Sequence, residues 1–565
     1  MSPILDSLNS TNVVPLRQPP MEPGVGAAAS ERQLRDTASE ILGTGERRFL
    51  RDDYDARMEA FAEELAGLSP EDGARLVAEL TTQDPGALNS WLKLDTLDRL
   101  HGEGRVDQAG YQAVADAFAS GYARGDIDQQ QAETFLQQYT LDGMAPGHRI
   151  DAWTQARDFI GAMEPARADA FREAYATSLL ERVADGGGQF HTSGVAMQLI
   201  ADAGDPHMAA RVFSQVTEAA GAGIGDPAQA ASARAEARAT LLEAIGESSI
   251  GFENSDGAFE GLRNPLATLI DSVAAQPDTQ QWNEVAVEIA RYAEASNDDI
   301  FFDPYTDKPI ASTAEALSGL LSGEQGEAVL DALTTRDSAS TRGGDGHAQE
   351  YGQNAIDLGN LLRITAFNPD NPAAGDAMQA VKDYAQTYKD FLNGVDRSYP
   401  PHLNDADAPQ SEAVNRLGIL GGAAFDAITQ SKIDLDNREA ATQQLVGFAV
   451  DLAVSAVPGG GAVSRLVGSD LKAVFGNNPA IDRVIDQALQ GGDTLGSAAV
   501  DQLKQDIAGA LSEGQVDLEV LRDQVNGFVV DTMLDGLRDV DGHTYRNQVE
   551  NTIEAVQTDI TQNRG

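Results

Sequence analysis

Residues 69–80 read SPEDGARLVAEL, a serine and a proline followed by two acidic residues and a run containing alanine and leucine. Serine at a helix N-cap accepts a hydrogen bond from a free N–H of the first turn. Proline suits the first helical position because it has no N–H to leave unpaired. Glu71 and Asp72 complement the positive end of the helix dipole. The stretch therefore predicts a helix that begins at Pro70.

The same pair, a polar residue followed by proline, recurs along the chain. It occurs again at Asp84-Pro85, Glu164-Pro165, Asp205-Pro206, Asp226-Pro227, Asn264-Pro265, Asn371-Pro372 and Asn478-Pro479. Alternation of apolar and polar residues, which would indicate strands, is scarce. We therefore predict an all-α fold, a multi-helix array of short capped helices with two or more helical domains.

A second start signal combines glycine, a β-branched residue and aspartate. It appears at residues 104–108 (GRVDQ) and 125–129 (GDIDQ), and again at residues 513–517 (EGQVD). In each case we expect glycine to end one helix and aspartate to cap the next.

The composition excludes several classes of function. The chain has 565 residues, of which 40 are basic and 89 acidic, so its net charge is −49. Nucleic-acid binding needs a basic surface, and anionic membranes repel such a chain. A basic protein partner or a secretion chaperone suits this charge, although the acids could also simply solvate helix faces. The chain has no cysteine, which excludes disulfides, thiol catalysis and cysteine-ligated zinc.

Breaks in the helical pattern predict four segments. Residues 1–30 contain five prolines and no helical period, and they predict a disordered N-terminal segment. Residues 31–396 predict the helical array, and residues 397–411, with two adjacent prolines, a linker. Residues 412–565 predict a C-terminal helical domain with a buried apolar hairpin. Residues 1–12 lack the basic start and apolar core of a cleaved secretory signal, so residues 1–30 could direct leaderless export or form an ordinary flexible terminus.

The candidate catalytic residues lie on one glycine-rich segment. Asp345 and Glu350 flank His347 there, and an imidazole near two carboxylates could act as a general base or a metal ligand. The alternative is a plain loop between two helices. No pattern in the sequence indicates a bound cofactor or metal: the acidic loops lack the spacing of calcium sites, and the glycine-rich turns lack that of phosphate loops.

Residues 418–467 carry a resemblance to known proteins. Two glycine-interrupted apolar helices are expected at residues 417–430 and 445–457, joined by a charged link and closed by Pro458 and three glycines. This order resembles the helical carrier regions of secreted bacterial effectors and polymorphic toxins. The resemblance implies a compact region that carries a cargo or binds a host partner. Asp426 and Asp451 interrupt the apolar stretches, so we expect a buried hairpin and no stable insertion into a membrane at neutral pH.

These observations predict a leaderless secreted bacterial effector-like protein that acts by protein–protein binding through a helical body. Its partner would be a host protein or a secretion chaperone. One alternative is a cytosolic helical scaffold or adaptor, located in the cytoplasm. Another is an enzyme with a site near His347, although binding is favoured over catalysis.

Overall fold

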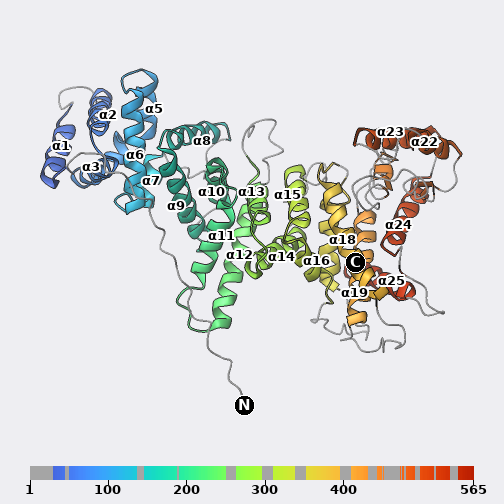
Figure 1. Ribbon diagram of the computed structural model, residues 1–565. Helices are drawn as coiled ribbons and strands as arrows, with labels where there is room; N and C mark the ends of the chain where they lie inside the picture. Colours follow the sequence, from blue (N-terminus) through green and yellow to red (C-terminus); the bar gives the residue numbers. More distant parts are fainter. Residues whose placement is uncertain are drawn as a thin grey trace, which may run out of the picture. The chain divides into compact units, whose positions relative to one another are not determined.

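In the computed structural model, the described part of the chain is helical and contains no strand, which confirms the predicted all-α fold (Figure 1). The structure describes residues 29–44, 50–136, 146–186, 190–249, 263–295, 310–336, 352–368, 370–394, 409–430, 479–489, 497–513, 517–534 and 545–564, with scattered positions between 442 and 475 and residue 537.

The chain divides into two compact units. Unit 1 consists of Met1–Gln137 and Asp158–Arg167, and unit 2 of Gln138–Arg157 and Ala168–Gly565. The chain therefore passes between the units within α8 (Pro146–Gly161). Residues 397–408 of the predicted linker lie outside the described residues, so the linker stays a prediction. Helices on both sides of it belong to unit 2.

Unit 1 is built on the packing of α3 against α6, with α2 and α5 also packed on α6 and α1 on α3. Its buried aromatic side chains include Phe118, Phe135 and Phe159, whose rings contact one another. The helices that precede α8 in unit 1 are α1 (Glu31–Gly43), α2 (Leu50–Ala66), α3 (Pro70–Gln83), α4 (Ala87–Ser90), α5 (Leu94–Gly102), α6 (Gln108–Arg124) and α7 (Gln129–Phe135).

In unit 2, helices pack largely on their next-but-one neighbours: α10 on α12, α11 on α13, α13 on α15, and α17 on α19. Such packing gives a stacked array, as the sequence predicts. The helices are α9 (Pro165–Ala184), α10 (Phe190–Ala203), α11 (Met208–Ala220), α12 (Pro227–Ser249), α13 (Pro265–Ala274), α14 (Gln280–Ala295), α15 (Ala311–Ser322), α16 (Gly326–Leu333), α17 (Gly352–Ile364), α18 (Ala374–Gly394), α19 (Pro409–Gln430), α22 (Pro479–Leu489), α23 (Ser497–Glu513), α24 (Leu518–Leu534) and α25 (Tyr545–Arg564).

Five of the eight polar-proline pairs begin a helix as predicted: α3, α9, α12, α13 and α22 each start at the proline. At α3 the Ser69 hydroxyl accepts a hydrogen bond from the Asp72 N–H at 3.1 Å. At α13 the Asn264 side chain accepts from the N–H groups of Leu266 and Ala267. These caps satisfy N–H groups that have no partner within the helix.

The other three pairs were predicted wrongly as helix starts. Helices α4, α11 and α18 begin two residues after the prolines of Asp84-Pro85, Asp205-Pro206 and Asn371-Pro372. In each pair, the Asp or Asn side chain accepts a hydrogen bond from the backbone N–H two residues later, at 2.9–3.1 Å. The carbonyl of the same residue accepts one from the N–H three residues later. This is a tight turn with proline at its second position. The fixed φ of proline suits such a turn as well as it suits a helix start, so the sequence pattern is the same.

The first two glycine–aspartate signals are confirmed. Gly125 ends α6 with a φ of +76°, a left-handed conformation that glycine adopts without strain. Asp107 then caps α6 by accepting from the Gly110 N–H, and Asp128 caps α7 in a reciprocal capping box with Gln131.

Helix α19 is surrounded by α17, α18, α24 and α25. It crosses α25 at Gly418 and Gly422, where an added Cβ would overlap Thr552 and Val556. The predicted hairpin begins within this helix, most of whose apolar residues are buried. On the predicted second arm, Leu445, Val446, Ala449, Val450 and Ala453 are fully buried. The link between the arms lies outside the described residues, so the hairpin itself stays a prediction.

None of the helices that the structure describes is both long and apolar enough to cross a membrane.

Candidate functional site

The three predicted catalytic residues, Asp345, His347 and Glu350, lie outside the described residues, so the prediction of a site around His347 is untested. The described residues that border this segment are joined to each other. Asn354 on α17 donates through Nδ2 to the Thr335 carbonyl at 2.9 Å, and Arg291 on α14 donates to Asn354 Oδ1 at 3.3 Å. The contact between Asn354 and Thr335 therefore lies next to residues 336 and 352, the described residues on either side of this segment.

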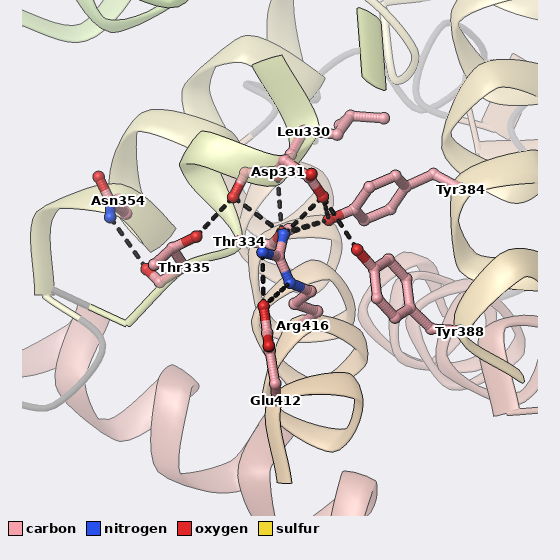
Figure 2. Close-up of polar contacts among 9 residues, drawn as sticks. All are labelled: Leu330, Asp331, Thr334, Thr335, Asn354, Tyr384, Tyr388, Glu412 and Arg416. Atoms are coloured by element: carbon pink, nitrogen blue, oxygen red, sulfur yellow. Dashed lines mark hydrogen bonds and ion pairs between the residues drawn. The ribbon is translucent and has the colours of Figure 1, made fainter. Parts of the chain in front are cut away.

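Beside Thr335 lies the most extensive polar network among the described residues of unit 2 (Figure 2). We call it the Arg416 network and define it as the side chains of Asp331, Thr334, Tyr384, Tyr388, Glu412 and Arg416. Its members come from α16, its C-cap, α18 and α19.

Local structure places each member. Thr334 ends α16, and both its N–H and its hydroxyl donate to the Leu330 carbonyl, at 2.9 and 2.7 Å. This closes the last turn of α16, which carries Asp331. Tyr384 and Tyr388 are one turn apart on α18, with their ring centroids 5.0 Å apart and edge-on.

One oxygen of Asp331 is the centre of the network. Its Oδ1 accepts from Arg416 Nη1 at 2.6 Å, from the Tyr384 hydroxyl at 2.8 Å and from the Tyr388 hydroxyl at 2.9 Å. The Tyr384 hydroxyl also contacts that of Thr334 at 2.6 Å. A carboxylate with three donors to one oxygen is strongly fixed in position.

Arg416 uses its remaining donors on a second carboxylate. Its Nε and Nη2 donate to Glu412 Oε1 at 3.0 and 2.8 Å, and its guanidinium lies 5.5 Å from the centroid of the Tyr388 ring. The side chain of Arg416 is only 11% exposed, whereas Asp331 and Glu412 are 43% and 60% exposed. A buried cation thus connects two carboxylates that reach solvent.

The Arg416 network is suited to holding helices together. Burial raises the pKa of Tyr384 and of Tyr388, so both phenols stay protonated and donate at neutral pH. A guanidinium is charged at every physiological pH. The two phenols and the guanidinium therefore keep their protons at neutral pH, and their contacts fix α19 to α16 and α18.

The sequence singled out none of these residues. Arg416 is the one basic residue in α19, a helix that is otherwise mostly apolar and buried. That lone basic residue in a mostly buried helix is the signal that could have indicated a buried partner, because buried charges are paired. Nothing in the sequence indicates that the partner is Asp331, which lies 85 residues away.

Within the described ranges, no group of three or more histidine, aspartate or glutamate side chains could hold a metal ion. No protein-family model and no curated protein sequence matches the chain.

Proposed function

We propose that this protein acts by binding a basic partner protein through the outer faces of its helical body, as a secreted bacterial effector, and that residues 1–30 direct its export. The observation that carries the binding proposal is how the charged residues are distributed. Several arginine side chains connect helices to one another, and many carboxylates face solvent.

Arginines pair between helices in several parts of unit 2. Arg211 on α11 binds Glu173 on α9 at 2.8 Å, and Arg238 on α12 binds Glu288 on α14 at 2.5 Å. Arg416 binds Asp331 in the same way. Because the net charge is −49, the chain carries many carboxylates beyond those that its basic residues can neutralise. Such an excess attracts basic partners over a distance of about a Debye length.

Helix α18 shows the most regular arrangement of these carboxylates. Residues 376–390 read DAMQAVKDYAQTYKD, two copies of the heptad D-x-x-Q-x-x-K and a final aspartate. We call Asp376, Asp383 and Asp390 the aspartate row. All three are exposed on one helix face, and Val381, Tyr384 and Leu392 are buried on the other.

The aspartate row has no basic partner among the described residues. Gln379 and Gln386 donate to Asp383 and Asp390, at 2.8 and 2.7 Å, which orients these carboxylates without neutralising them. Phe391 follows the row and is 43% exposed, one of few large apolar side chains on the described surface. The row therefore presents three negative charges, two of them oriented by glutamine, and an apolar contact at its end.

The occupant that fits this face is a basic amphipathic helix. Residues seven apart on a helix lie about 10 Å apart along its axis. A partner helix with lysine or arginine at seven-residue spacing would match all three aspartates at once, and an apolar residue at its end would cover Phe391.

A pair of synthetic helical peptides tests this binding. One carries lysine at every seventh position, and the other has the same composition with irregular lysine spacing. We expect the full-length protein to bind the regular peptide more tightly. The triple variant Asp376→Asn, Asp383→Asn, Asp390→Asn should weaken that binding by about tenfold or more.

The matched control removes the same charge from another exposed face. Glu236, Glu243 and Glu247 are exposed on α12, and their triple change to glutamine should weaken binding far less. Equal binding of the two peptides, or equal loss in the two triple variants, would contradict the proposal.

Export is tested separately. Deletion of residues 2–28 keeps Ser30, whose hydroxyl and backbone complete the capping box of α1, so the helical body should be unaffected. We expect the deletion to abolish export while the protein still accumulates and stays helical. Unchanged localisation would favour the cytosolic scaffold instead.

The enzyme alternative has its own test. A loss of biological effect in His347→Ala, with peptide binding intact, would favour the enzyme.

A further inference from the structure

Unit 1 contains a cluster of titratable groups that the proposed function does not use. Asp98 on α5 is half-buried and accepts a hydrogen bond from the hydroxyl of Tyr111 on α6, at 2.6 Å. Tyr111 itself is buried. A short hydrogen bond between a phenol and a half-buried carboxylate is sensitive to the charge of that carboxylate.

The Tyr111 ring connects this bond to the end of α8. It lies 4.7 Å from the His101 ring and 6.0 Å, edge-on, from the ring of Phe159. Phe159 is fully buried in the last turn of α8, next to the exposed Asp158. This turn belongs to unit 1, whereas α8 up to Arg157 belongs to unit 2.

Further contacts anchor the chain just after this turn. The Glu164 N–H donates to Asp116 at 2.8 Å, and Arg167 lies 3.5 Å from Glu71. These contacts are within unit 1. Residues 158–163 are thus the first residues after Arg157 that pack against the rest of unit 1.

Mostly negative groups face Asp98. Asp95 and His101 lie on its own helix α5, Tyr111 on α6, and Asp158 on α8. On α2, which also packs on α5, Asp55 is paired with Arg99 and Arg105, and Glu59 is paired with Arg105. Burial, together with the charges of Asp158 and Asp95, raises the pKa of Asp98 to about 6, against the opposing effects of the Tyr111 hydrogen bond and of His101.

We propose that Asp98, Tyr111 and Asp158 form a proton-controlled clamp, in which protonation of Asp98 strengthens the hold of unit 1 on residues 158–163. With Asp98 ionised, its charge repels Asp158 at the end of α8. With Asp98 protonated, this repulsion is removed and the carboxyl group keeps its contact with Tyr111. When residues 158–163 open, Asp98 loses the charge of Asp158 and part of its burial, so its pKa falls. The closed state therefore has its full extra stability below the open-state pKa and loses it as the pH rises through about 6.

Amide hydrogen exchange of the full chain, corrected for the intrinsic effect of pH, measures this hold directly. We expect the equilibrium for opening of residues 158–163 to be severalfold, and at most about tenfold, less favourable at pH 5 than at pH 7. Asp98→Asn should remove the difference, because asparagine has the same shape and no charge to gain. Glu63→Gln, at an exposed carboxylate of α2, should leave the difference in place.

A second variant separates a proton-controlled role from a purely structural one. Tyr111→Phe removes the hydrogen bond that favours the ionised form of Asp98, so the pH at the midpoint of the effect should move upward. A residue that only packs would lower protection at all pH values and leave the midpoint unchanged. The proposal would be overturned if the natural chain showed no pH effect, or if Asp98→Asn showed the same effect as the natural chain.

Discussion

Arg416 joins α19 to α16 and α18 through hydrogen bonds to Asp331 and Tyr384. Without the guanidinium, Asp331 would keep only its hydrogen bonds from the hydroxyls of Tyr384 and Tyr388. Glu412 would lose both of its hydrogen bonds from Arg416. We expect Arg416→Met to lower the free energy of unfolding by about 1–2 kcal/mol, because the guanidinium is mostly buried although both of its carboxylate partners reach solvent. Arg546→Met is the control, because Arg546 also pairs with two carboxylates but is 37% exposed. It should cost less than about 1 kcal/mol in urea unfolding. Equal losses would contradict this role for Arg416.

Among the helices, the crossing of α19 and α25 depends on the absence of side chains at Gly418 and Gly422. Gly418→Ala places a Cβ against Thr552, and we expect a loss of about 1–3 kcal/mol in the free energy of unfolding. Gly509→Ala on α23 is the matched control, since no atom lies within 4 Å of its added Cβ. Alanine is the better helix former there and should stabilise by about 0.5–1 kcal/mol. Destabilisation by both variants would show that the close crossing is not the cause.

These helices also show how far the sequence predicts the fold. Capping by Asp107 and Asp128 could be predicted because it joins residues three positions apart. The contact of Arg416 with Asp331 could not, because it spans 85 residues and depends on which helices become neighbours. Asp84, Asp205 and Asn371 were ambiguous for a different reason, since one value of φ at proline serves both a turn and a helix start.

On the scale of the whole of unit 2, helices on the two sides of residues 397–408 pack together. Helix α19 contacts α17 and α18, which precede this segment, as well as α24 and α25, which follow it. The prolines in the sequence predict where helix stops, but they do not predict which helices pack across the break. We expect a chain cleaved at a specific protease site inserted after Gly394 to elute as one species in gel filtration, and to separate only in denaturant. Separation under native conditions would contradict this packing.

The central claim is that oriented aspartates on the helical body recognise a basic helix, and a charge exchange tests it most directly. Asp376, Asp383 and Asp390 are replaced by lysine in the full chain, and the regular lysine peptide is replaced by one with glutamate at the same positions. The binding constants of all four combinations are then measured at one ionic strength, because such contacts are screened by salt. We predict that each like-charged combination binds weakly and that the doubly exchanged combination recovers the affinity of the original pair. If the glutamate peptide does not bind the lysine variant more tightly than it binds the natural chain, the aspartate row is not the binding surface.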